Sequence, residues 1–120
     1  MAYDSTNIFA RILRGEIPNS TVYEDAHVLA FKDIRPQAKV HVLVIPKGAY
    51  VSAQDFGARA SEAEIAAMAR AISKITQELG IAESGYRLIA NTGGHGHQEV
   101  PHYHVHILGG QPIGKMVHLP

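Results

Sequence analysis

The feature that most constrains this chain is a run of seven residues, His102 to Leu108, in which histidine alternates with hydrophobic side chains. In a β-strand, side chains two positions apart project from the same face. The run therefore predicts a strand with His102, His104 and His106 along one face and an apolar opposite face packed into a core. A slip of one residue would bury the histidines, so the apolar face also fixes the register.

Three imidazoles on one strand face can act as a nucleophile, as general acids or bases, or as metal ligands. The alternative is that the histidines are polar residues on a solvent-exposed strand face and have no chemical role. The strict alternation of three histidines disfavours it. A zinc site formed by His102, His104 and His106 with one open position is a second alternative. His41, in the β-branched segment Val40 to Ile45, is a fourth candidate if its strand lies beside the histidine strand.

The loop before the histidine strand, Thr92 to Gln98, contains three glycines. Glycine allows backbone N–H groups to turn toward one point and bind an anion. Because the loop leads directly into the histidines, the sequence predicts a phosphate cradle here.

The composition narrows the classes of function. The chain has 120 residues, 11 basic and 11 acidic side chains and no cysteine. The length predicts one domain over residues 1–120. Zero net charge argues against nucleic acid or a membrane surface as partners, and the lack of cysteine excludes disulfides and thiol nucleophiles. The N-terminus has no signal-like apolar run, so we expect a cytoplasmic protein.

Apolar periodicity and capping residues predict the order helix, three strands, long helix, two strands. Strands joined by short turns favour antiparallel pairing, so the predicted fold class is α+β with the helices on one face of the sheet. The predicted elements are helices over Asn7–Gly15 and Ser61–Leu79 and strands over Thr21–Glu24, His27–Asp33, Val40–Ile45, Tyr86–Asn91 and His102–Leu108.

The run from His102 to Leu108 matches the pattern His-φ-His-φ-His-φ-φ, where φ is hydrophobic. In this the chain resembles the histidine triad (HIT) nucleotide-binding proteins, specifically the Hint-like branch of adenosine phosphoramidases. The resemblance covers nearly the whole chain, through the segments 8–18, 31–38, 41–47 and 85–88 and Asn91. It implies a HIT-like fold, a five-stranded antiparallel sheet with two helices, and a homodimer that joins two sheets into one.

The resemblance also implies roles for single residues. His104 would attack the α-phosphorus and hold a nucleotidyl intermediate, and His106 would contact the phosphate and help the leaving amine depart. His102 and His41 would orient the nucleophile. Residues expected to bind the purine nucleotide are Asp33 at the ribose, Ile8, Phe9, Ile12, Phe31, Ile34 and Leu43 around the base, and Asn91, Gln98 and Glu99 beside the phosphate and leaving group.

The implied activity is hydrolysis of the P–N bond of purine nucleoside 5′-phosphoramidates, with adenosine as the nucleoside and no metal or other cofactor. A dinucleoside polyphosphate hydrolase of the same family and a non-catalytic AMP-binding module use the same residues and stay open as alternatives. Three positions depart from common family members: Pro101, His97 and Glu99. We hypothesise that Glu99 favours leaving amines that carry a positive charge.

Overall fold

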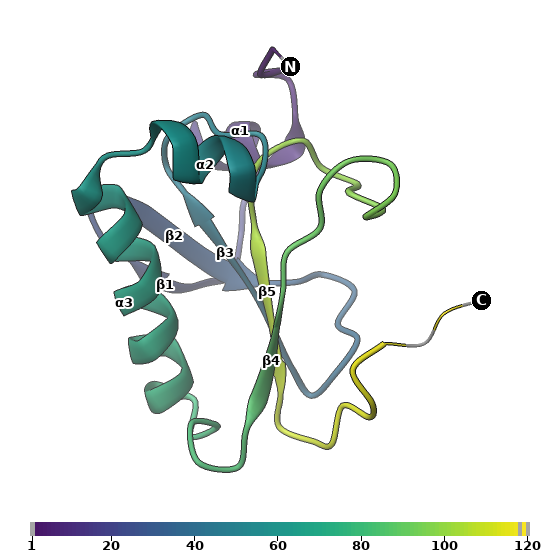
Figure 1. Ribbon diagram of the computed structural model, residues 1–120. Coiled ribbons are helices and arrows are strands. Elements are labelled where there is room, and N and C mark those ends of the chain that lie inside the picture. Colours follow the sequence, from purple (N-terminus) through teal and green to yellow (C-terminus); the bar gives the residue numbers. More distant parts are fainter. Residues whose placement is uncertain (1, 118, 120) are drawn as a thin grey trace.

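The computed structural model describes residues 2–117 and residue 119, and its centre is a five-stranded antiparallel sheet with the strand order β1-β2-β3-β5-β4 (Figure 1). The predicted fold class is therefore confirmed. The elements are α1 (Ile8–Leu13), β1 (Thr21–Glu24), β2 (Val28–Lys32), β3 (Val40–Pro46), α2 (Ala53–Arg59), α3 (Glu62–Glu78), β4 (Tyr86–Ile89) and β5 (Val105–Gly109).

The sheet is buried on both faces, and this corrects the prediction that all helices pack on one side. Alternate residues of β2 and β3 belong to two different apolar clusters, as the pleat of a strand requires. Val28, Val42 and Ile107 pack with Ile75 of α3 on one face. On the other face the cluster consists of Phe9 and Ile12 of α1 with Leu29, Phe31, Leu43 and Ile45. Helix α1 thus covers the face opposite α3.

The long helix α3 forms where the sequence predicts it. Ser61 accepts from the Glu64 backbone N–H and Glu64 accepts in return from the Ser61 N–H, and together they form a capping box at the start of the helix. Gly80 follows with a positive φ of 71°, which glycine adopts without strain. The buried stripe is centred on Met68, Ala71 and Ile75, whereas Ile65 and Leu79, near the two ends of the same apolar period, are partly exposed.

Helix α2 was not predicted. It has seven residues, and only Phe56 is buried, so the segment carries no helical apolar period. Its signal in the sequence is a cap: the Ser52 side chain accepts from the Asp55 N–H. Phe56 packs edge-on against Tyr50 and at a tilt against Tyr103, which fixes the helix over the segment that precedes β5.

The histidine strand is shorter than predicted, because β5 begins at Val105 and leaves His102 and His104 in the segment before it. The β3–β5 register pairs Val44 with Val105 and would therefore bring Tyr103 opposite Pro46. Proline has no N–H to donate there. The Tyr103 N–H donates to the carbonyl of Tyr50 instead, at 2.7 Å, and the regular ladder ends. The other predicted strands that differ from the structure do so by one or two residues at an end.

Strand β4 forms one edge of the sheet, with Tyr86 and Leu88 partly exposed. An exposed apolar edge is where a second sheet can pair, so the predicted dimer has a suitable edge and stays a prediction. Within the part of the chain that the structure describes, no helix is both long and apolar enough to cross a membrane.

Candidate active site

A cavity of about 970 Å³ opens on the face of the sheet that α1 covers. Its apolar wall comes from both helix and sheet, and its polar wall contains four histidines: His41, His97, His104 and His106. Of the residues predicted to form the site, the cavity is lined by Ile8, Phe9, Ile12, Phe31, Asp33, Ile34, His41, Leu43, Asn91, Glu99, His104 and His106. His102 and Gln98 are not among its lining residues.

His104 is almost fully buried, with its ring edge-on to Phe9. Its Nδ1 lies 2.6 Å from the backbone carbonyl oxygen of His102. A carbonyl can only accept a hydrogen bond, so the proton of the neutral ring must be on Nδ1. The second nitrogen, Nε2, then carries a lone pair, and no hydrogen-bond partner for it occurs among the described residues. Burial lowers the pKa of His104, which keeps that lone pair available at neutral pH.

His41 and His106 form a pair. The Nδ1 of His41 accepts from the Gln37 backbone N–H at 3.0 Å, so its proton is on Nε2. That Nε2–H donates to the Nδ1 of His106 at 2.9 Å and lies 3.4 Å from a carboxylate oxygen of Asp33. The Nε2–H of His106 is therefore left as a donor, and His41 acts on His106 rather than on His104.

Burial also keeps this pair uncharged. Desolvation lowers the pKa of His106 to about 4, with smaller contributions from His104 and His41. Desolvation lowers the pKa of His41 as well, although Asp33 opposes the shift. At neutral pH both rings are neutral, so the hydrogen bond between them has the single direction derived above.

His102 contributes to the site through its backbone and not through its ring. The ring is fully buried: its Nε2–H donates to the Pro46 carbonyl at 2.9 Å, and its Nδ1 accepts from the Tyr3 hydroxyl at 2.6 Å. Burial lowers its pKa to about 4. His102 and His104 precede β5, and the His102 ring does not line the cavity, so the prediction that one strand presents all three imidazoles to the site is corrected. A zinc site made of His102, His104 and His106 would require His102 to give up a hydrogen bond to Pro46 or to Tyr3.

Within the described residues, one group of side chains has the composition of a metal site: Asp33, His41 and His106, whose ligand atoms lie within 4.8 Å of one another. The facing nitrogens of the two histidines already share a proton at 2.9 Å. A cation bound there would have to displace that proton. Of the metal alternatives, this group is the one whose ligand atoms already lie close together among the described residues.

Several N–H groups of the loop before β5 bond within the loop and are not free for the predicted phosphate cradle, which stays a prediction. They are those of Gly93, His97 and Gln98. The Gln98 amide holds the loop closed, because its oxygen accepts from Gly93 and its NH₂ donates to the carbonyls of Val51 and Val100. Gly96 is required for a different reason: a Cβ there would lie 2.4 Å from the Thr92 carbonyl oxygen.

The structure adds residues that sequence reasoning gave no role. Gln37 fixes the tautomer of His41 through its backbone N–H, and Tyr3 binds His102. A signal for Gln37 was available, since it lies in the segment 31–38 on which the resemblance rests. Further cavity-lining residues without a predicted role are Ile17, Pro18, Asn19, Ser20, Lys32, Arg35, His97 and Val100.

Comparison with known proteins decides the family. The HIT domain model matches residues 14–113, which include the cavity wall from Ile17 to His106. This chain belongs to the HIT domain family. The match covers β1 to β5 and the histidines His41, His102, His104 and His106, whereas α1, which supplies Ile8, Phe9 and Ile12 to the cavity, precedes it.

Relatives and solved structures of this family resemble the whole chain. A HIT-like protein of Azospirillum brasilense is 56% identical, with 96% of this chain and 94% of the relative covered. A purine nucleoside phosphoramidase of Escherichia coli is 48% identical, with 92% of each covered. A HIT family hydrolase from Clostridium thermocellum has a TM-score of 0.86 at 40% identity, with 95% and 99% covered. The predictions of the family, its fold and a hydrolase are confirmed.

The buried histidines predict how stability depends on pH. In the unfolded chain a histidine binds a proton below about pH 6.5, whereas folded His102 and His106 do so only near pH 4. Between these values the unfolded state binds more protons, so the free energy of unfolding falls as the pH falls. The slope is about 1.4 kcal/mol per pH unit for each such histidine.

Urea unfolding at pH 7 and pH 5 measures this dependence. We expect His106→Asn to flatten it by the contribution of one histidine, and the matched variant His95→Asn, at an exposed loop position, to leave it unchanged. Equal slopes in His106→Asn and the wild type would contradict the assignment of a neutral buried His106.

Proposed function

We propose that this enzyme hydrolyses the P–N bond of purine nucleoside 5′-phosphoramidates, with adenosine as the nucleoside, through a nucleotidyl intermediate on His104. The observation that carries the proposal is the protonation state of His104: its Nδ1–H is held by a carbonyl, and its Nε2 lone pair has no partner among the residues that the structure describes. The E. coli relative named purine nucleoside phosphoramidase, at 48% identity, supports the choice of substrate class.

The cavity suits a nucleotide in its size and because one part of its wall is apolar and another part is polar. Its volume of about 970 Å³ is at the upper end of small-molecule sites. Phe9, Phe31 and Leu43 offer apolar area for a purine. The Asp33 carboxylate accepts one hydrogen bond, from the Arg35 N–H, and keeps acceptor sites for ribose hydroxyls.

In the first step, the Nε2 lone pair of His104 forms a bond to the α-phosphorus. The P–N bond of the substrate breaks, and its electron pair passes to the amine nitrogen, which takes a proton from water at the cavity mouth. The Nε2–H of His106 donates to a phosphate oxygen and favours departure of the amine. Covalent catalysis of this kind divides one difficult step into two easier ones.

The ring of His104 becomes positively charged in this step, because it then carries phosphorus on Nε2 and a proton on Nδ1. The His102 carbonyl stabilises that charge through the existing hydrogen bond, which strengthens when its donor becomes cationic. The carboxylates of Asp33 and Glu99 also favour positive charge on this ring. These interactions are stronger in the charged state than in the neutral one, which is the requirement for lowering a barrier.

In the second step, the oxygen of a water molecule forms a bond to phosphorus. The bond between phosphorus and His104 Nε2 breaks, its electron pair returns to the ring, and the proton of the attacking water is released to solvent. The products are the nucleoside 5′-monophosphate and the free amine, and the ring regains its Nδ1–H tautomer.

Turnover of adenosine 5′-phosphoramidate in the presence of a strong chelator tests the function. We expect cleavage by the wild type and a loss of at least about 10³-fold in kcat for His104→Ala, because the nucleophile is removed. His95→Ala, at an exposed loop histidine, serves as the matched control and should keep full activity.

Three other results would redirect the proposal. Cleavage of a dinucleoside polyphosphate but not of the phosphoramidate would favour the polyphosphate hydrolase. AMP binding without turnover of either compound would favour a binding module. Activity that the chelator abolishes would favour metal catalysis at Asp33, His41 and His106.

We further propose that Glu99 selects leaving amines of positive charge. Its carboxylate lines the cavity, is largely exposed, and lies 3.3 Å from the Nε2 of His97. We expect Glu99→Ser to lower kcat/KM about threefold to fivefold for a phosphoramidate with a cationic leaving amine, since an exposed charge pair contributes modestly. A neutral amine of the same length should be unaffected.

Competition kinetics with the two substrates measure this ratio directly. The control variant Glu83→Ser removes an exposed carboxylate outside the cavity and should keep the wild-type ratio. An unchanged ratio in Glu99→Ser would remove Glu99 from the account of specificity.

A further inference from the structure

The N-terminal segment contacts the innermost histidine of the site. The Tyr3 hydroxyl lies 2.6 Å from the Nδ1 of His102, across 99 positions of sequence, and the two rings meet edge-on with centroids 5.6 Å apart. Tyr3 precedes the HIT domain match, which begins at residue 14. One partner of the contact, Tyr3, therefore lies outside the part of the chain that the family model matches, whereas His102 lies inside it.

The position of the proton on the His102 ring determines the direction of its hydrogen bond with Tyr3. The Pro46 carbonyl accepts from Nε2, so Nε2 carries the single proton of the neutral ring. Nδ1 then carries only a lone pair and must accept, and the Tyr3 hydroxyl is its donor. The ring is fully buried, so water does not replace that donor without a rearrangement.

The same residue holds the nucleophile. The carbonyl of His102 accepts from the Nδ1–H of His104 at 2.6 Å, in a segment that has left the regular ladder of β5. The Tyr103 N–H, in the same peptide group as the His102 carbonyl, donates to the Tyr50 carbonyl and fixes this segment at its backbone. The ring of His102 is anchored in addition at its two ends, by Pro46 at Nε2 and by Tyr3 at Nδ1. The orientation of the carbonyl that selects the tautomer of His104 depends on the backbone bond and on both ring anchors.

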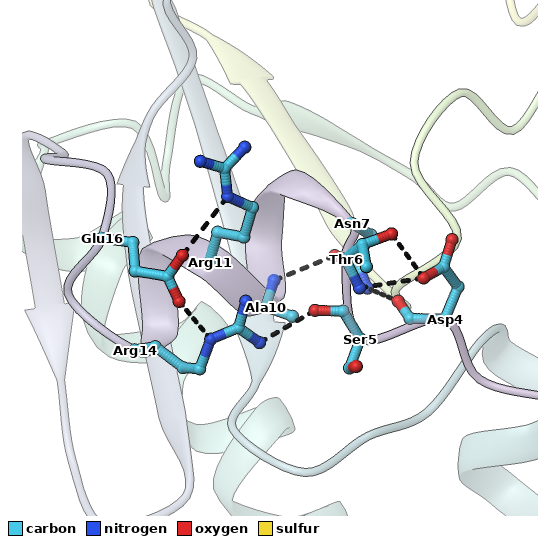
Figure 2. A network of polar contacts seen from close by, with 8 residues as sticks. All are labelled: Asp4, Ser5, Thr6, Asn7, Ala10, Arg11, Arg14 and Glu16. Carbon is cyan, nitrogen blue, oxygen red and sulfur yellow. Dashed lines mark hydrogen bonds and ion pairs between the residues drawn. The ribbon is translucent and has the colours of Figure 1, made fainter.

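The segment that carries Tyr3 is itself fastened to α1, as Figure 2 shows. The carbonyl of Asp4 accepts from both the backbone N–H and the side-chain amide of Asn7, and Asn7 caps α1 by accepting from the Ala10 N–H. Arg14, just past α1, donates to the carbonyl of Ser5. The residues after Tyr3 are thus held to the helix whose Phe9 packs on His104.

We propose that Tyr3 is a positioning residue for the reaction: its hydroxyl holds the ring of His102, and through the His102 carbonyl it fixes the Nδ1–H tautomer and the orientation of His104. Tyr3 touches neither the cavity nor the reacting atoms. It acts on the rate of the chemical step and not on nucleotide binding. The kinetic part of this proposal rests on the phosphoramidase function, whereas the structural part does not.

The variant Tyr3→Phe tests the proposal, because it removes only the hydroxyl and keeps the ring contact. Tyr23→Phe is the matched control: it removes a hydroxyl of the same kind, bonded to Asp25 at 2.8 Å on strand β1, away from the cavity. In Tyr3→Phe we expect kcat to fall about fivefold to tenfold and KM to stay within about twofold. In Tyr23→Phe both constants should be those of the wild type.

Nuclear magnetic resonance of ¹⁵N-histidine-labelled protein without substrate provides a second readout. In the wild type, we expect His102 to be protonated on Nε2 and His104 on Nδ1. In Tyr3→Phe, the His102 Nδ1 resonance should move toward that of a nitrogen without a hydrogen bond. The His104 Nδ1–H should exchange with solvent at least about fivefold faster, because its acceptor is less well fixed.

The outcomes separate the two proposals. Unchanged His104 exchange in Tyr3→Phe, or an equal loss of kcat in Tyr23→Phe, would overturn the role of Tyr3. A loss of thermal stability in Tyr3→Phe with unchanged kcat and unchanged His104 signals would show that Tyr3 only seals the core, which also overturns it. If the wild type cleaves no phosphoramidate, the proposed function fails, and the ¹⁵N signals still decide whether Tyr3 positions His104.

Discussion

The hydrogen bond from His104 Nδ1–H to the His102 carbonyl is the interaction on which the site depends. It makes one nitrogen of a buried ring the donor and leaves the other as a lone pair in the cavity. A backbone carbonyl is a fixed acceptor that cannot be protonated in the working pH range, so the tautomer is set by the fold. The chemistry proposed for His104 follows from that setting, because the neutral ring is the nucleophile and the charged ring is what the carbonyl stabilises.

The two sides of the site are built by different parts of the sheet. Strands β3 and β5 pair so that Leu43 lies opposite His106, and this register brings His41 within hydrogen-bond distance of His106. On the N-terminal side of Val105, the hydrogen-bonded pairing of β5 with β3 ends where Pro46 would be the next partner. The carbonyl of Pro46 accepts from the buried ring of His102. Because His102 lies outside the strand pairing, its carbonyl is available to accept a hydrogen bond from His104.

The sequence allowed the fold to be predicted, and most of the site residues that it named line the cavity, for clear physical reasons. Alternation identified Val105 and Ile107 as core residues, and the helical period with its capping box located α3. Helix α2 was missed because it buries a single residue. The strand was extended over His102 and His104 because alternation continues there, while the reason it stops, Pro46, lies on another strand. The contact of Tyr3 with His102 joins segments 99 positions apart, and no local pattern encodes it.

Trapping of the intermediate tests the central claim most directly. The enzyme is mixed with a stoichiometric amount of an adenosine 5′-phosphoramidate, quenched in base within the first turnover, digested and analysed by mass spectrometry. The account predicts a burst of amine release and one adenylylated peptide, modified at His104 and absent from His104→Ala. Amine release without any adduct, or an adduct on His106 or another residue, would contradict the assignment of His104 as the nucleophile.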